Sequence, residues 1–318
     1  MAIEFIGSVA PAHPVPAASD PDYPTQAAAL VDEAGFDKLL IGYSAGAPDG
    51  MLVANEVLTT TSRLGVVVTQ VPGLVTPTVA ARQYATLAAF HPGRVALHAS
   101  GDDVLADARD GDALGPTDRS DRSARAAEFL DVVELTWRSQ RPFDHSGEFY
   151  RVTGAYSTAR PEGGHLQIYV SYESTADLPV AAEHADVILL AGAPVPAIAG
   201  RIASLRVAAA RHGRSPRFGV SLRLLASPTR RTPRDRLRLV TEAGPAAAPA
   251  WIPPAGGGIA SGQVRLAGSY DEVARGLLDY VDIGVSTLVI GHDPQAEGGD
   301  CAEVIARVHA GADRRLVI

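Results

Sequence analysis

Leu64-Gly-Val-Val-Val-Thr-Gln-Val71 is the stretch of sequence that decides the fold. It is an almost unbroken apolar run, and Pro72 and Gly73 end it. A strand that is apolar on both faces belongs in a parallel sheet covered by helices, because antiparallel strands usually alternate apolar and polar residues. A helical pattern follows over residues 77–90 and begins with a proline, which suits a first helical turn. This region therefore predicts one strand followed by one helix.

The same unit recurs along the chain. Strands are expected at residues 3–9, 36–43, 64–71, 94–98, 167–170, 186–190, 218–225 and 287–291. Helices are expected at residues 26–34, 77–90, 124–137, 196–212 and 270–283, with Thr25 and Ser269 as the residues that cap two of them. Eight strands joined by helices predict an α/β fold, a closed (β/α)8 TIM barrel, and one such domain accounts for residues 1–318.

Three stretches interrupt this alternation and are expected as insertions at the C-terminal face of the barrel or outside it. Residues 102–121 are polar and follow the fourth strand, so they predict a mouth loop. Residues 141–152 resemble a β-hairpin around Ser146-Gly147, outside the barrel. Residues 242–262 are dominated by alanine, proline and glycine and predict a lid loop.

The charge of the chain argues against two classes of partner. The formal net charge is −8 at pH 7, which opposes broad attraction to nucleic acid or to an anionic membrane surface. One basic cluster stands out, made of Arg230, Arg231, Arg234, Arg236 and Arg238. We interpret this cluster as a solvated helix face, and an anion site is the alternative.

Cys301 is the only cysteine, so the chain cannot form an internal disulfide or a thiolate metal cluster. Its apolar neighbours indicate a terminal helix in which the thiol packs rather than reacts. The first residues lack the pattern of a secretory leader, and no window has the length of a membrane span. We therefore expect a cytoplasmic protein that neither enters a membrane nor binds a metal.

Several short motifs occur in an order that is characteristic of one family. The longest is Val71-Pro-Gly-Leu-Val-Thr-Pro-Thr-Val-Ala-Ala-Arg82, directly after the third expected strand. The others include Glu33-Ala-Gly-Phe-Asp37, Pro92-Gly-Arg94, Gly147-Glu-Phe-Tyr-Arg-Val152, Ala181-Ala-Glu-His-Ala-Asp186 and Gly268-Ser-Tyr-Asp-Glu-Val-Ala274. Their order over nearly the whole chain resembles the bacterial luciferase-like, flavin-dependent monooxygenases of the alkanesulfonate monooxygenase type.

This resemblance implies a TIM barrel with an active site at its C-terminal face. It also implies reduced FMN as the cofactor, supplied by a separate flavin reductase, and a small organic substrate that reacts together with dioxygen. The family further implies a homodimer or homotetramer formed through helices on the side of the barrel.

The resemblance assigns the flavin to the ends of two strands. After the fourth strand the family has Asn followed by Thr-Gly, and this chain has His98-Ala-Ser100-Gly101. His98 and Ser100 are candidates to hydrogen-bond the edge of the flavin ring. An interior histidine with a purely structural role is the alternative for His98.

After the fifth strand the family presents a Gly-Gly-Ser-Ser segment to the FMN phosphate, and this chain has Ser171-Tyr172-Glu173-Ser174. Ser171 and Ser174 retain possible donors, although Ser174 is equally well placed to cap a helix. Glu173 brings a carboxylate to a phosphate site, and Tyr172 replaces a glycine that allows close backbone approach.

The candidate catalytic residues are His13, His98, Arg223 and His292. His13 stands after the first strand, where the family commonly has a histidine, while Arg223 and His292 end the seventh and eighth strands. A loop histidine without a function and a salt-bridged arginine are the alternatives for His13 and Arg223.

The family's other functional positions hold different residues in this chain, namely Ala47, Ser123, Asp293 and Gln295. The groups that read a sulfonate are therefore missing, and the chain is predicted to oxidise a substrate other than a simple alkanesulfonate. The alternatives are a barrel that has lost flavin and binds another small molecule or performs non-redox chemistry, and a pseudoenzyme that supports an active relative.

Overall fold

A closed barrel of parallel strands forms the centre of the molecule. The computed structural model describes residues 2–9, 22–43, 48–99, 119–228, 265–292 and 300–316. Within these ranges the barrel strands are β1 (Glu4–Val9), β2 (Lys38–Ile41), β3 (Gly65–Gln70), β4 (Val95–Ala99), β7 (Ile168–Tyr172), β8 (Val187–Ala191), β9 (Arg217–Ser227) and β11 (Val285–His292). Each pairs in parallel with its neighbours, and β9 closes the ring by pairing with both β8 and β11. The predicted TIM barrel and its eight strands are confirmed.

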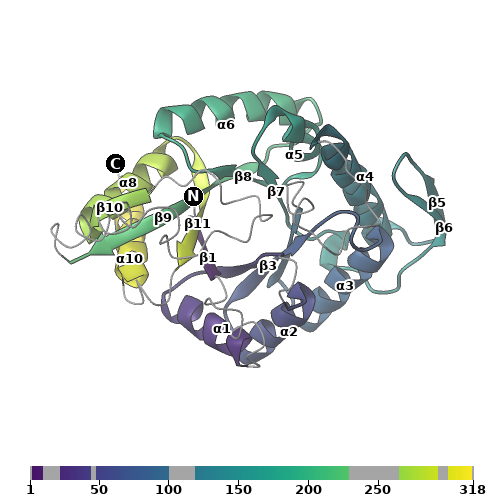
Figure 1. Ribbon diagram of the computed structural model, residues 1–318, viewed down its shortest axis with the longest axis horizontal. Coiled ribbons are helices and arrows are strands. Elements are labelled where there is room, and N and C mark those ends of the chain that lie inside the picture. The colour runs from purple at the N-terminus through teal and green to yellow at the C-terminus, as the bar shows by residue number, and fades with distance from the viewer. Residues whose placement is uncertain are drawn as a thin grey trace, which may run out of the picture.

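Helices surround the strands in a ring (Figure 1). They are α1 (Tyr23–Glu33), α2 (Gly50–Thr60), α3 (Pro77–Phe90), α4 (Arg119–Arg138), α5 (Leu178–His184), α6 (Val195–Ala210), α8 (Tyr270–Asp282) and α10 (Asp300–Leu316). Ser269 caps α8 as predicted, whereas α1 begins before Thr25, with Asp22 at its N-cap and a proline in its first turn. Cys301 is buried in α10, where it packs. No helix within the described ranges is both long and apolar enough to cross a membrane.

Two additions lie outside the eight-stranded ring. The strands β5 (Phe143–Ser146) and β6 (Arg151–Ala155) form an antiparallel hairpin beside α4, over the region where the sequence predicts one (Figure 1). The Glu128 carboxylate on α4 accepts hydrogen bonds from the amides of Glu148, Phe149 and Tyr150 and holds the hairpin turn. The strand β10 (Arg265–Ser269) pairs in parallel with the C-terminal end of β9, from Arg223 to Ser227. The sequence does not predict this strand.

The predicted loops lie mostly outside the described residues. This applies to residues 102–118 of the mouth loop, to the lid loop at 242–262 and to the arginine cluster at 230–238. The last three residues assigned to the mouth loop belong instead to α4, because this helix begins at Arg119.

The interior of the barrel is apolar in its middle layer. Side chains from seven of the strands form one buried cluster, made of Ile6, Leu40, Val67, Ala96, Tyr169, Val187, Leu189 and Val289. Gly219 of β9 completes the layer without a side chain, since a Cβ atom there would lie 2.5 Å from Leu189 Cδ2. The barrel is therefore closed by packing at mid-height, and any ligand must enter from one of its ends.

A polar network crosses the N-terminal end of the barrel. The Glu4 carboxylate of β1 forms an ion pair with Lys38 Nζ of β2 at 2.9 Å. It also accepts hydrogen bonds from the hydroxyl groups of Tyr169 on β7, at 2.9 Å, and Thr287 on β11, at 3.0 Å. Lys38 donates in addition to Gln167 Oε1 at 2.7 Å. Four strands that are distant in sequence are thereby joined through one carboxylate.

Charge keeps this network ionised. Burial disfavours the Glu4 carboxylate, but the Lys38 ammonium, the Tyr169 hydroxyl and Arg217 outweigh burial and hold the pKa of Glu4 below its usual value. Burial and the Glu4 charge raise the pKa of Tyr169, so its hydroxyl stays protonated and available to donate. The network is stable as a charged unit at neutral pH.

We expect Lys38→Met to lower the free energy of unfolding by about 3 kcal/mol, because it leaves the Glu4 carboxylate buried without its cation. Urea denaturation at pH 7 measures this. The double variant Glu4→Gln with Lys38→Met should recover part of the loss, since the amide carries no charge. Arg307→Met breaks an exposed ion pair with Asp271 and should lower the free energy of unfolding far less than Lys38→Met does. A double variant no more stable than Lys38→Met would contradict the charge explanation.

Candidate functional site

Three polar side chains form a chain of hydrogen bonds at the C-terminal end of the barrel. Thr69, His98 and Ser171 stand on the adjacent strands β3, β4 and β7, and Thr69 lies directly opposite His98 in the strand register. The Thr69 Oγ1 atom lies 3.0 Å from His98 Nδ1, and the Ser171 Oγ atom lies 2.8 Å from His98 Nε2. This is the end of a TIM barrel at which enzymes of this fold place their active sites.

His98 is neutral in this position. Its side chain is only 2% exposed, and burial lowers the pKa of His98 to about 4. A neutral imidazole carries one proton, so one of its nitrogens donates and the other accepts. If Nε2 carries the proton, it donates to Ser171, and the Thr69 hydroxyl donates to Nδ1. The hydroxyl proton of Ser171 is then left for a ligand. If Nδ1 carries the proton instead, the roles are exchanged and the hydroxyl proton of Thr69 is left for a ligand. The chain therefore offers a ligand one hydroxyl donor and no net charge.

We expect His98 to make folding pH-dependent between about pH 6.5 and pH 4. The unfolded state binds a proton near pH 6.5, while the folded state resists protonation until about pH 4, so stability present above pH 6.5 is lost as the pH falls. This linkage lowers the free energy of unfolding at pH 4 by on the order of 3 kcal/mol relative to its value above pH 6.5.

His98→Gln removes the titrating group and should flatten this part of the profile. Urea denaturation of both proteins at several pH values between 4 and 7.5, with the difference plotted against pH, isolates the histidine from other titrating groups. Parallel profiles for the two proteins would show that His98 is not the group responsible.

The turn after β7 is organised by a residue that the sequence analysis did not select. Asp177 is 4% exposed, and its Oδ2 atom accepts hydrogen bonds from the backbone amides of Glu173 at 3.0 Å and Ser174 at 2.9 Å. The Ser174 hydroxyl in turn accepts from the amide of Ala176 at 3.2 Å. The two side chains form a capping box over the 3-10 helix η4 (Thr175–Asp177) and the start of α5.

The residues of this turn do not fit a phosphate group. The resemblance to the luciferase-like monooxygenases implies an FMN phosphate here, held by backbone amides. Two of those amides already donate to the Asp177 carboxylate, and a phosphate could take them only by approaching that like charge. Glu173, half-buried, adds a second carboxylate to the same turn. The uncharged hydroxyl groups around His98, in contrast, fit a neutral heterocyclic ring.

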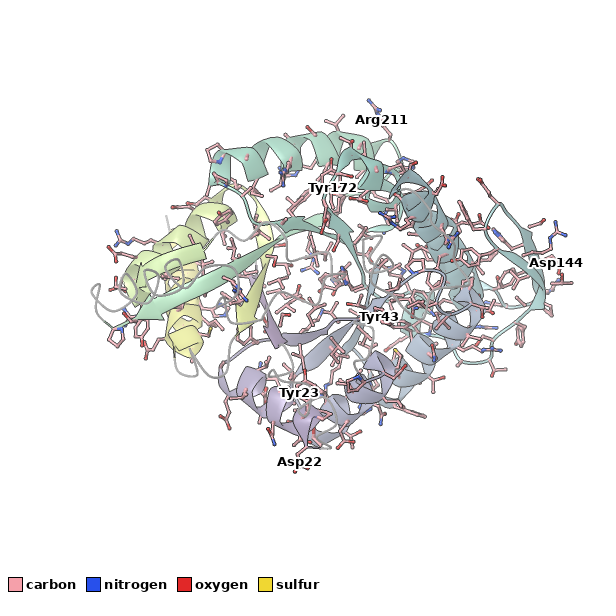
Figure 2. The ribbon with its side chains drawn as sticks, viewed as in Figure 1. Asp22, Tyr23, Tyr43, Asp144, Tyr172 and Arg211 are labelled. Carbon is pink, nitrogen blue, oxygen red and sulfur yellow. The ribbon has the colours of Figure 1, made fainter. Side chains whose placement is uncertain are left out.

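The structure separates the remaining candidates around β7. Ser171 lies in the hydrogen-bonded chain with His98, and Ser174 is a helix cap. Tyr172 is half-buried and packs against the core between strands and helices, on the rim of the barrel below α6 (Figure 2). Consecutive strand residues point to opposite faces, which explains why Ser171 and Tyr172 have different surroundings.

Other candidates stand on other elements of the fold or lie outside the described residues. Arg223 is half-buried on β9 opposite Arg265 of β10, and His292 is the last residue of β11. Ser123 is buried in α4, and its hydroxyl has no hydrogen-bond partner among the described residues. His13, Ala47, Ser100, Gly101, Asp293 and Gln295 lie outside the described residues. The described part of the chain contains no cluster of three or more side chains suited to hold a metal ion.

Two residues of the site were detectable from the sequence. The spacing Ser174-x-x-Asp177 before an apolar run is the signature of a capping box, which places Asp177 against the first amides of the turn. Thr69 stands two residues after Val67 in a strand, so both side chains point to the same face. That His98 would lie between Thr69 and Ser171 depends on the order of the strands and not on spacing.

Comparison with known proteins agrees with this architecture. The sequence model of the luciferase-like monooxygenases matches residues 4–287, which is most of the chain. The chain belongs to the luciferase-like monooxygenase family. Membership accounts for the barrel and for the position of the polar site at its C-terminal end.

Solved structures of this family share the fold at low sequence identity. A riboflavin lyase, solved with modified FMN and its substrate riboflavin, has 17% identity and a TM-score of 0.81, with 98% of this chain and 92% of that chain covered. EDTA monooxygenase from Chelativorans sp. BNC1 has 17% identity and a TM-score of 0.79, covering 98% and 94%. An F420-dependent secondary alcohol dehydrogenase has 16% identity and a TM-score of 0.73, covering 97% and 99%. These likenesses concern the fold.

Proposed function

We propose that this protein is a flavin-dependent oxidoreductase, of the monooxygenase type, that acts on a small organic substrate other than a simple alkanesulfonate. The observation that carries this proposal is the family match over residues 4–287. The position of Thr69, His98 and Ser171 at the C-terminal end of the barrel supports it, because this is where the fold binds its ligands. Two of the fold neighbours named above are complexes, the riboflavin lyase with modified FMN and the alcohol dehydrogenase with an F420 adduct, which favours a flavin-type cofactor.

A bound flavin supplies the redox chemistry, and the chain supplies binding, orientation and exclusion of water. His98 stays neutral from about pH 5 upward, so it adds no charge beside a neutral ring. Ser171 and Thr69 offer one hydroxyl proton to a ring nitrogen or carbonyl, and the tautomer of His98 decides which of them donates. The packed layer below, with Val67 and Leu189, keeps water from reaching the site through the barrel.

The finer assignments stay predictions. The collinear motifs support the alkanesulfonate monooxygenase type as the nearest branch, with reduced FMN delivered by a separate reductase. A cytoplasmic location is a further prediction, which the single cysteine, Cys301, supports. His13, Arg223 and His292 remain the candidates for contact with the substrate.

Titration of the purified protein with flavins tests the proposal. Absorbance and fluorescence changes should report binding of FMN, riboflavin or coenzyme F420, and Ser171→Ala should weaken the binding by about tenfold through loss of one hydrogen bond. Ser286→Ala is the matched control, since Ser286 is another buried strand serine outside the His98 group. Absence of binding by every one of these compounds at high micromolar concentration, in oxidised and reduced form, would refute the proposal.

One observation favours a second function, a barrel that has abandoned flavin. The Asp177 carboxylate occupies amides in the turn where the family implies a phosphate. A protein of this kind would bind another small molecule at the His98 group or support an active relative. A chain that is stably folded on its own but binds no flavin would distinguish this function from the first.

We further propose that the chain forms a homodimer through α2 and α3. A groove of about 590 Å³ lies between these helices, and Leu52 and Phe90 on its border are 73% and 69% exposed. Large exposed apolar side chains at a groove are typical of a protein interface.

We expect Leu52→Glu combined with Phe90→Glu to convert the dimer to a monomer, because each carboxylate would have to be buried at the interface. Light scattering coupled to size-exclusion chromatography measures the mass. Val207→Glu changes an exposed apolar residue on α6 and should leave the mass unchanged. A dimer that persists in the double variant would contradict this interface.

A further inference from the structure

We infer that Asp177 selects the cofactor by its tail, so that the protein binds a flavin ending in a hydroxyl group, as in riboflavin, at least as tightly as one ending in a phosphate, as in FMN. This inference rests on the proposed flavin-dependent function. It concerns the turn between β7 and α5, and not the ring end of the site.

The donors that a phosphate needs are already engaged in this turn. Asp177 Oδ2 lies 3.0 Å from the amide nitrogen of Glu173 and 2.9 Å from that of Ser174. The hydroxyl of Ser174 accepts a hydrogen bond from the amide of Ala176. Displacing Asp177 would leave its buried carboxylate without these hydrogen bonds, which is unfavourable. A phosphate therefore competes with a group that the fold already holds in place.

Charge adds to this competition. A flavin phosphate carries nearly two negative charges at neutral pH, and the turn contains the carboxylates of Asp177 and Glu173. The helix α5 has only seven residues, so the positive end of its dipole offers little compensation. Riboflavin lacks the phosphate, so it meets no repulsion here.

The polar groups near the turn suit a neutral tail that carries hydroxyl groups. A carboxylate accepts hydrogen bonds but donates none, and an alcohol supplies the donor that it needs. The helix α4 packs against η4 and α5, and its first turns carry Ser123, a buried serine whose hydroxyl has no partner among the described residues. A serine hydroxyl can donate to, or accept from, the hydroxyl of a sugar-alcohol chain.

The experiment measures the dissociation constants of riboflavin and FMN for the full chain at pH 7.5 by fluorescence titration. For the unmodified protein we expect FMN to bind no more tightly than riboflavin. In Asp177→Asn the amide oxygen can still accept from both backbone amides, while the charge is gone. The affinity for FMN relative to riboflavin should therefore rise by about tenfold.

Asp144→Asn is the matched control, because Asp144 also accepts a hydrogen bond from a backbone amide, that of Gly154. It lies on the hairpin at the edge of the molecule, well away from Tyr172 and the β7 turn (Figure 2). This variant should leave the ratio of the two dissociation constants unchanged. Circular dichroism and thermal melting of each variant establish that it is folded.

The outcomes separate this inference from the proposed function. Binding of FMN at least tenfold more tightly than riboflavin by the unmodified protein would overturn the inference and leave the flavin-dependent function standing. An unchanged ratio in folded Asp177→Asn would overturn the role of Asp177. If neither flavin binds, this inference fails, and the proposed function fails as well if coenzyme F420 also does not bind. The ratio for the unmodified protein requires no variant, so the inference can be tested even if Asp177→Asn does not fold.

Discussion

The ion pair between Glu4 and Lys38 is the interaction on which the rest of the barrel depends. A barrel closes only if its first and last strands meet in the correct register, and Glu4 on β1 contacts side chains from β2, β7 and β11. Because a buried carboxylate is unfavourable without its partners, any arrangement that separates these strands leaves a charge unsatisfied. The network thus favours one closure over the alternative registers that the apolar layer alone would tolerate.

The polar groups at the two ends of the barrel have different characters because their surroundings differ. At the N-terminal end, a cation and an anion compensate each other across strands. At the C-terminal end, His98 is buried with no charged partner among the described residues, so it is neutral and is held by two hydroxyl groups. The first arrangement stabilises the fold, while the second leaves hydrogen-bonding capacity for a ligand. Between them the apolar layer keeps the two ends independent.

The turn after β7 keeps its place in the family fold but satisfies its amides with a side chain of its own. The helix that follows β7 needs its first amides satisfied, and a bound phosphate or a side-chain carboxylate can do this equally well. This chain uses Asp177, which makes the turn self-sufficient. Under the proposed function, the barrel positions the cofactor and individual residues in this turn select its tail.

The sequence by itself determined the eight strands, most of the helices between them and the family, because buried parallel strands are recognisable as apolar runs and the motifs keep their order. It also located His98 and Ser171 at strand ends. It did not determine that Thr69, His98 and Ser171 form one hydrogen-bonded chain, that Lys38 reaches Glu4, or that β10 adds to β9. These contacts join residues separated by tens of positions, so they exist only once the strands are ordered around the barrel. Asp177 lies between the two cases: its spacing from Ser174 indicates a cap, but only the folded turn shows that its carboxylate takes the amides that a phosphate would need.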